Sequence, residues 1–388
     1  MCRLLQYGGI EAACLLLKDS SPDTQAGASM ALYHITRDPS ERERLASKGV
    51  VEALYGVVRR RKADDLTMKH CLGGLCLCAS TQSIAPRLVK NDHLRLLLDC
   101  VSDTSAFTTS RILAIRIVLA LARQESVQEA IVMDKNGALK RLVQCLELPE
   151  EDLVVVTAQS LAFLSTGSEP IKTRIVQCDT ALHSVLCRTA EKWSTSVSVL
   201  SNISCTIANL ASVTSDSSRL LIPGTTAGVL CVIANTHEDS YEIQRHCGRG
   251  LGNLSVVPTN ALRLLPYLGT TIVRMLHSSN VTVRSHALRV MDNLTVVTMA
   301  TPTRQQVAEL IKEDPQCQPI GTRLQLLVDQ MGDNRTGRIA TTIVERLQSI
   351  DTTTPHTAYG TNSATDTSHD TSSILDTAAE DQEWMRTP

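Results

Sequence analysis

One short pattern recurs seven times along this chain, at intervals of 40 to 46 residues. A side chain that is small in most copies is followed four residues later by an aliphatic one, and a second aliphatic follows three residues after that. Such offsets lie on one face of an α-helix. The first aliphatic positions of the seven copies are Leu32, Leu75, Val118, Leu161, Ile207, Leu251 and Met291. A pattern that keeps its register over so many copies predicts a chain built from one repeated helical unit.

Two further elements precede each of these helices. About 20 residues earlier, a glycine or polar residue opens a short amphipathic run, as at Gly49 and Gly137. Glycine there suits a sharp turn between helices, because it has no Cβ to clash. A shorter element lies before that turn, as in residues 41–47 and 127–133. The predicted unit therefore has three helices, and a single unit buries its apolar face only by stacking on its neighbours.

The composition supports stacked helices over aromatic-cored globules. Only 3% of the 388 residues are aromatic, although 43% are hydrophobic. No stretch of eighteen uninterrupted apolar residues occurs, which argues against a membrane span, and the first residues lack the apolar core of a signal peptide. The net charge of −2 gives no reason to expect nucleic-acid binding. We therefore expect a cytoplasmic protein, with the nucleus or the cytoskeleton as other possible locations.

The sequence contains no recognisable catalytic or metal-binding motif. It has no glycine-rich phosphate loop, no paired-histidine helix and no nucleophile elbow. The 13 cysteines are scattered, and the densest run, around Cys71 and Cys78, lacks a second pair at zinc-site spacing. These cysteines fit small buried residues on a helix face better. We expect no enzyme activity, no cofactor and no metal.

Two of the copies contain motifs that resemble the armadillo repeat. Residues 137–143 read Gly-Ala-Leu-Lys-Arg-Leu-Val, and residues 252–255 read Gly-Asn-Leu-Ser. The resemblance implies an all-α armadillo-type solenoid, a right-handed superhelix of three-helix repeats. We expect seven repeats within residues 1–300 and a divergent eighth or capping repeat within 301–350. Residues 351–388 differ in composition, with ten Thr, four Ser and a net charge of −6, which is typical of a disordered tail.

The resemblance also implies that the third helices line a concave groove for an extended peptide. The last two copies, residues 246–257 and 286–297, are nearly superimposable there. Asparagine offers both a donor and an acceptor to a peptide backbone, and arginine offers a planar fork for carboxylate or phosphate. The predicted groove residues are Arg249, Asn253, Arg289, Asn293, Asn209, His246, His286, Asn202 and Arg116. The expected occupant is an extended acidic or phosphorylated segment of a partner protein.

Several alternatives stay open. The asparagines could bond within the solenoid and the arginines could form a solvated face. The acidic tail could occupy its own groove. The protein could be a structural component of a large cytoskeletal or axonemal assembly. An importin-α-like cargo adaptor is disfavoured, because no copy has the tryptophan of that groove and Arg116, Arg249 and Arg289 stand at its position. The basic groove resembles that of β-catenin-like proteins more closely.

Overall fold

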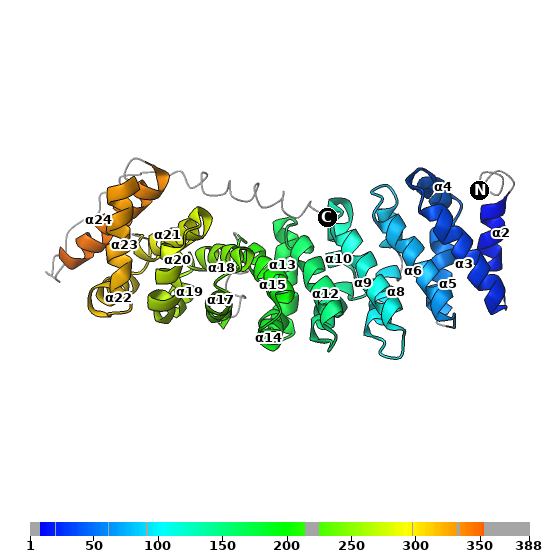
Figure 1. The fold of residues 1–388 in the computed structure, drawn as a ribbon, viewed down its shortest axis with the longest axis horizontal. Helices are drawn as coiled ribbons and strands as arrows, with labels where there is room; N and C mark the ends of the chain where they lie inside the picture. Colours follow the sequence, from blue (N-terminus) through cyan, green and yellow to red (C-terminus); the bar gives the residue numbers. More distant parts are fainter. Residues whose placement is uncertain are drawn as a thin grey trace.

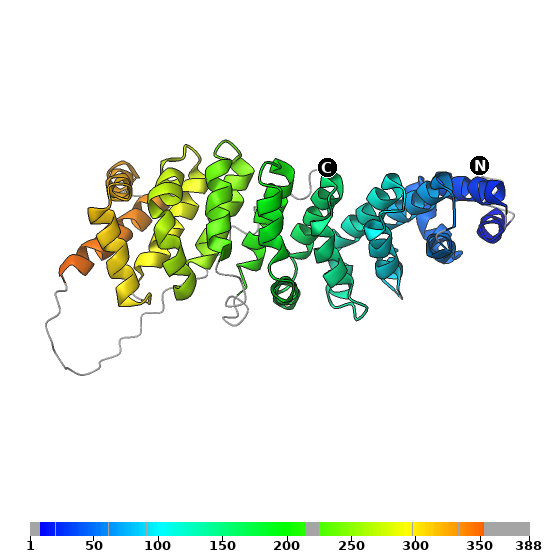
Figure 2. The same ribbon diagram turned by 90° about the horizontal axis from the view of Figure 1, so that it is seen from below.

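The computed structural model describes residues 8–19, 21–60, 62–90, 92–213, 225–296, 298–331 and 334–352. Within these ranges every regular element is a helix. Figure 1 shows the helices following one another along the long axis of an elongated molecule, from α2 near the N-terminus to α24. Figure 2, turned by 90°, shows the same single row. The predicted tail lies almost wholly outside the described residues.

The helices fall into three sets that alternate along the chain. The third helices of successive repeats are α3 (Pro22–Thr36), α6 (Asp65–Ala79), α9 (Thr108–Ala122), α12 (Glu151–Leu164), α15 (Val197–Leu210), α18 (Tyr241–Leu254), α21 (Val281–Thr295) and α24 (Arg335–Thr352). The second helices are α2 (Gly9–Leu16), α5 (Val50–Arg60), α8 (His93–Ser102), α11 (Ala138–Gln144), α14 (Val185–Lys192), α17 (Thr225–Thr236), α20 (Val273–His277) and α23 (Gln318–Met331).

The first helices form the third set. They are α4 (Arg42–Ser47), α7 (Ala85–Leu88), α10 (Glu125–Val132), α13 (Glu169–Ala181), α19 (Pro258–Leu264) and α22 (Thr301–Glu313). Short 3-10 turns adjoin three helices: η1 (Pro39–Glu41) precedes α4, η2 (Cys145–Glu147) follows α11 and η3 (Leu265–Tyr267) follows α19. A π-helical turn, η4 (Leu268–Ile272), leads into α20. No described helix is long and apolar enough to cross a bilayer.

The core runs along the third helices, where the sequence pattern predicts it. Each third helix packs against the next, from α3 and α6 through to α21 and α24. All seven first aliphatic positions are buried, with exposed fractions of 4% or less. Cys71 and Cys247, which stand where other copies have alanine, are fully buried. The all-helical stacked architecture is thereby confirmed, because each unit covers the apolar face of its neighbour.

Left-handed backbone marks the turns that lead into the second helices. Gly8, Gly49 and Gly137 have φ values of 78°, 79° and 80°, a conformation that costs glycine little. The turn before α14 has His183 and Ser184 instead, with φ values of 59° and 60°. The predicted glycine turns at Gly49 and Gly137 are therefore correct. The fifth repeat makes its turn in left-handed backbone without glycine.

Basic side chains join successive second helices. A helix ends with carbonyl groups that have no partner in the helix and carry partial negative charge. Three basic residues donate to such carbonyls one repeat earlier: Arg60 to Leu17 O at 2.7 Å, Lys192 to Leu148 O at 2.9 Å and Arg274 to Ala234 O at 3.0 Å. These bonds link three pairs of neighbouring repeats.

Candidate binding surface on the third helices

Three of the predicted asparagines form a ladder between third helices. Asn209 Nδ2 donates to Ser165 Oγ at 3.0 Å, Asn253 Nδ2 to Ala208 O at 3.0 Å, and Asn293 Nδ2 to Gly252 O at 2.9 Å. Each acceptor lies near the C-terminal end of the preceding third helix, where carbonyl groups lack helical partners. The NH2 group of each of these amides therefore bonds within the solenoid, which is one of the alternatives that the sequence left open.

The acceptor half of these amides has a different environment. No described residue donates a hydrogen bond to Oδ1 of Asn209, Asn253 or Asn293. The exposed fractions of Asn209 and Asn253 are both 7%, so only a small part of each side chain reaches the surface. These bonds fix the three amides in place. The Oδ1 atom of each amide can still accept a hydrogen bond.

Four basic side chains surround the surface near this ladder. Arg245 and Arg249 lie on α18, Arg289 lies on α21 and Lys172 lies on the first helix α13. The charge of Arg249 acts on Lys172, whose pKa is lowered first by burial and then by that arginine. We call these four residues the cationic cluster. It draws on helices α13, α18 and α21. Helices α18 and α21 pack against each other, and α13 packs against α15, the third helix that precedes α18.

The three arginines of the cluster each contact a neighbouring group. A Cβ on Gly252 would lie 3.4 Å from Arg289 Cδ, so the arginine stem lies against bare backbone of α18. Arg249 Nη2 lies 3.9 Å from Cys205 Sγ. Arg245 lies over the ring of Tyr241, 6.0 Å from its centroid, within the range of a cation–π contact. Stems fixed in this way lose less rotamer freedom when a ligand binds.

The two predicted histidines lie beneath the cluster. The exposed fractions of His246 and His286 are 1% and 6%, which leaves little surface for direct contact with a partner. Burial lowers the pKa of His286 to about 3, and the charges of Arg249, Arg289 and Arg245 act in the same direction. Burial, and then the charges of Arg249 and Arg245, hold the pKa of His246 well below its usual range. Both side chains are therefore neutral at physiological pH.

Close helix packing explains why these histidines are buried. A Cβ on Gly248 of α18 would lie 2.9 Å from His286 Cβ. Glycine at this position lets α21 approach α18 so closely that the imidazole is covered. Sequence reasoning placed both histidines on the stripe that faces a partner. The structure places them one layer deeper, where they pack the two helices together.

The remaining predicted residues lie apart from the cluster. Asn202 Nδ2 donates to Ser198 O of its own helix at 2.8 Å. Arg116 is exposed on α9, and α12 and α15 lie between that helix and α18. The structure thus brings together Arg249, Arg289 and the asparagine ladder, and it leaves Arg116 three third helices away.

Two cluster residues were missed by the sequence reasoning. Arg245 lies four residues before Arg249, so the helical period alone places the two on one face of α18. Lys172 lies on a first helix, and no spacing rule connects it with the third helices. Its Nζ donates to Ser212 Oγ at 3.0 Å, which points the ammonium group toward the end of α15.

Acidic residues also lie on the helices that carry the cluster. Asp292 of α21 is paired with Arg346, whose Nη1 lies 2.7 Å from Asp292 Oδ1. Glu169 is the acid that acts on Lys172, and Glu242 lies on α18 near its N-terminal end. Among the described residues, no group of three or more His, Cys, Asp or Glu side chains has a metal-site arrangement.

The opposite end of the third-helix surface is aromatic and apolar. The rings of Tyr33 and His70 stack at 5.6 Å between centroids, and a Cβ on Gly73 would lie 2.9 Å from the tyrosine ring. Met30 is 46% exposed there. Further along, Arg123 lies over the ring of Phe163 at 5.0 Å. The surface therefore changes from apolar at α3 and α6 to cationic at α18 and α21.

Comparison of the sequence with protein-family profiles and with curated proteins finds no match. Solved structures do match the fold. A crystal structure of an engineered protein aligns with a TM-score of 0.62 at 18% identity, covering 97% of this chain and 99% of that one. A designed armadillo repeat protein aligns with a TM-score of 0.52 at 17% identity, covering 63% of this chain and 99% of that one.

A second designed armadillo repeat protein, in complex with the peptide (KR)4, aligns with a TM-score of 0.51 at 16% identity. It covers 66% of this chain and 99% of its own. Identities this low establish the fold alone. Together with the all-helical stack and the buried repeat positions, these matches show that the chain has an armadillo-type fold.

Proposed function

We propose that this protein is a non-enzymatic interaction scaffold that binds an extended acidic or phosphorylated segment of a partner protein on its third helices. The observation that carries this proposal is the cationic cluster. Its four basic side chains come from three helices, and its arginines lie close to two histidines that burial keeps neutral. Several cationic side chains that lie close together above buried, neutral histidines produce a positive potential, which favours an anionic ligand.

The sign of the charge argues against a basic peptide. One of the designed armadillo proteins binds (KR)4, a peptide with only positive side chains. The cationic cluster would repel such a ligand, whereas guanidinium groups offer paired donors to carboxylates and phosphates. This contrast favours an acidic partner over the cargo of an importin-α-like adaptor.

The asparagine ladder would supply the backbone contacts. An extended segment has N–H groups along its length that need acceptors once it leaves water. Oδ1 of Asn253 and Asn293 can accept such bonds while Nδ2 stays on the neighbouring helix. Because the solenoid itself holds each amide, little side-chain freedom is lost on binding.

The test measures fluorescence anisotropy with two extended peptides, one rich in Asp, Glu and phosphoserine, the other made of alternating Lys and Arg. In the protein, Arg249→Glu with Arg289→Glu is compared with wild type. Two half-buried arginine contacts should together contribute about 2 kcal/mol or more, so the Kd of the acidic peptide should rise about 30-fold or more.

The matched control carries the same change in net charge far from the cluster. Arg37→Glu with Lys90→Glu reverses two exposed cations in the N-terminal repeats, and it should change the Kd about two-fold at most at 0.15 M salt. An acidic peptide that binds both variants equally would refute the proposal. Preference for the Lys-Arg peptide would instead support the cargo-adaptor alternative.

Two further alternatives predict different results. If the protein's own acidic tail occupies this surface, removing residues 351–388 should tighten binding of the acidic peptide. If the protein is a component of a large assembly, the purified chain should self-associate in sedimentation experiments, and a monodisperse monomer would argue against that role.

A further inference from the structure

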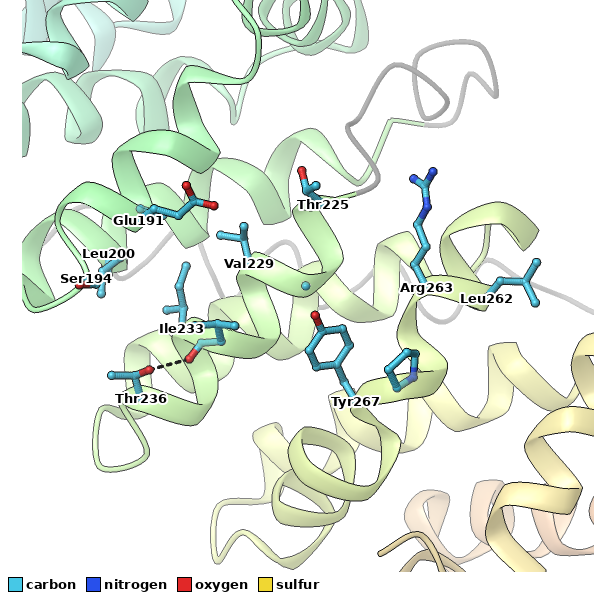
Figure 3. Close-up of a pocket in the computed structure, with 14 residues that line it drawn as sticks. Glu191, Ser194, Leu200, Thr225, Val229, Ile233, Thr236, Leu262, Arg263 and Tyr267 are labelled. Atoms are coloured by element: carbon cyan, nitrogen blue, oxygen red, sulfur yellow. Dashed lines mark hydrogen bonds between the residues drawn. The ribbon is translucent and has the colours of Figure 1, made fainter. Parts of the chain in front are cut away.

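A second candidate site lies among the second helices, away from the cationic cluster. A pocket of about 830 Å³ opens over α17, between α14 on one side and the α19–η3 segment on the other. Figure 3 shows Val229 and Ile233 of α17 in the middle, Glu191 on one side, and Arg263 and Tyr267 on the other. This volume is in the range of ligand-binding pockets.

The composition of α17 sets it apart from the other second helices. Its twelve residues, Thr225–Thr236, include no Asp, Glu, Lys or Arg. Every other described second helix carries at least one charged side chain. A helix without a charged face lacks the polar side that a helix normally turns to solvent. One face of α17 is in the core, through Leu230 and Cys231, but Val232 on the other face is 57% exposed.

The walls of the pocket complete an apolar surface with charged edges. Leu262 adds a second exposed aliphatic side chain, at 47%. A Cβ on Gly228 would lie 2.8 Å from Tyr267 Oη, so the tyrosine forms a wall only because that glycine lets it approach α17. Glu191 and Arg263 are both exposed, and neither forms an ion pair within the described part of the chain.

The chemistry of the floor favours a helical occupant over an extended one. The backbone of α17 is already hydrogen-bonded within its own helix, and the floor offers mainly Val229, Val232 and Ile233. An extended segment laid there would leave its N–H and C=O groups without partners, at a cost of several kcal/mol. A helix satisfies its own backbone and can place an apolar stripe on such a floor.

We propose that this pocket docks an amphipathic helix of a partner protein over α17. Its apolar stripe covers Val229 and Val232. The stripe is bordered by a basic residue on the flank that faces Glu191 and by an acidic residue on the flank that faces Arg263. Charge complementarity of this kind fixes the orientation of the bound helix. The site is independent of the proposed binding of an acidic segment on the third helices.

The experiment uses a phage-displayed library of amphipathic helices with randomised stripe and flank positions. The library is selected on the full chain and counter-selected on Val232→Glu. Enriched peptides should carry Lys or Arg on one flank and Asp or Glu on the other. As synthetic peptides they should lose about 10-fold or more in affinity on Val232→Glu, the loss expected when a buried apolar contact of about 1.4 kcal/mol is removed.

Matched controls separate docking from general destabilisation. Val281 on α21 is 58% exposed, so Val281→Glu makes the same change at the same exposure and should leave the affinity within two-fold. Glu191→Lys with Arg263→Glu should select peptides with exchanged flanks. Arg249→Glu with Arg289→Glu should have no effect, so failure of the third-helix proposal and failure of this one are distinguishable.

Three results would overturn the inference. One is a selection that enriches no peptide sensitive to Val232→Glu. Another is a set of enriched peptides without flank preference. The third is a dimer of the full chain that Val232→Glu converts to monomer, because the occupant would then be a second copy of this protein.

Discussion

The neutral, buried His286 predicts a specific loss of stability in mild acid. An unfolded histidine has an ordinary pKa of about 6.5, and in the folded protein burial and the neighbouring arginines lower it to about 3. On acidification the unfolded chain takes up a proton before the folded chain does. The contribution of this group is therefore fully present above pH 6.5 and is lost as the pH falls from 6.5 toward 3.

The size of the effect follows from the width of that window. Each pH unit within it corresponds to 1.36 kcal/mol for one group. Between pH 7.5 and pH 5 about 1.5 units of the window are crossed, so the free energy of unfolding should fall by about 2 kcal/mol on account of His286 alone. Glutamine has a similar shape and does not titrate, so His286→Gln removes this term.

The assay is urea unfolding of the wild type and His286→Gln at pH 7.5 and pH 5, followed by far-ultraviolet circular dichroism. Carboxylates such as Glu150, whose pKa is held low by Arg111, titrate in both proteins and cancel in the difference. Between pH 7.5 and pH 5 the free energy of unfolding of the wild type should fall by about 2 kcal/mol more than that of His286→Gln. A shift below about 0.5 kcal/mol would refute the reasoning, because His286 would then titrate as it does in water.

Two further predictions use matched pairs of substitutions. Gly248→Ala should destabilise the protein by about 1–3 kcal/mol in thermal unfolding, because its Cβ would lie 2.9 Å from a side chain of α21. A Cβ on Gly27, which lies in α3, would meet nothing within 4 Å. Gly27→Ala should therefore stabilise the protein by about 0.5–1 kcal/mol. If both substitutions changed the stability in the same direction, the packing argument would be contradicted. Arg111→Gln should cost about 2–4 kcal/mol, because this buried guanidinium is bonded to Glu150 and to a backbone carbonyl. Arg44→Gln, at a 42% exposed side chain in a surface pair, should stay within about 0.5 kcal/mol.

The fold could be predicted because its information is periodic. Leu75, Val118 and Leu161 are each separated by 43 residues, and all three are fully buried. A small residue four positions earlier and a glycine or polar residue before the second helix recur with them. Because every repeat contacts mainly its neighbours, the same local rules apply along the chain, and register alone locates the core.

The candidate site was predicted only in part. Helical spacing placed Arg249 and Arg289 at equivalent positions on third helices that pack against each other in the structure, and it also placed Asn253 and Asn293 there. It could not show that the amide donors of these asparagines bond to the preceding helix. That bond depends on how closely two helices approach, which a one-dimensional pattern does not contain.

The close packing of helices also explains why His286 and Lys172 differ from what the sequence predicted. Gly248 lets α21 approach α18 closely enough to cover His286, and Lys172 joins the cationic cluster only because a first helix packs near the end of α15. The pocket over α17 likewise needs three helices in their places. The absence of charge in that helix is visible in its sequence, but nothing in the sequence shows which of its faces stays open.

The sequence by itself determined the all-helical repeat, its period, its core positions and the basic character of the last third helices. These properties follow from short-range spacing, since residues three or four apart share a helix face whatever lies beyond them. Only the tertiary structure decided which polar groups are used within the solenoid, which histidines lose their charge and where an apolar helix face remains uncovered. Those outcomes depend on burial and on the distance between side chains some 40 residues apart, and both arise only when the repeats stack.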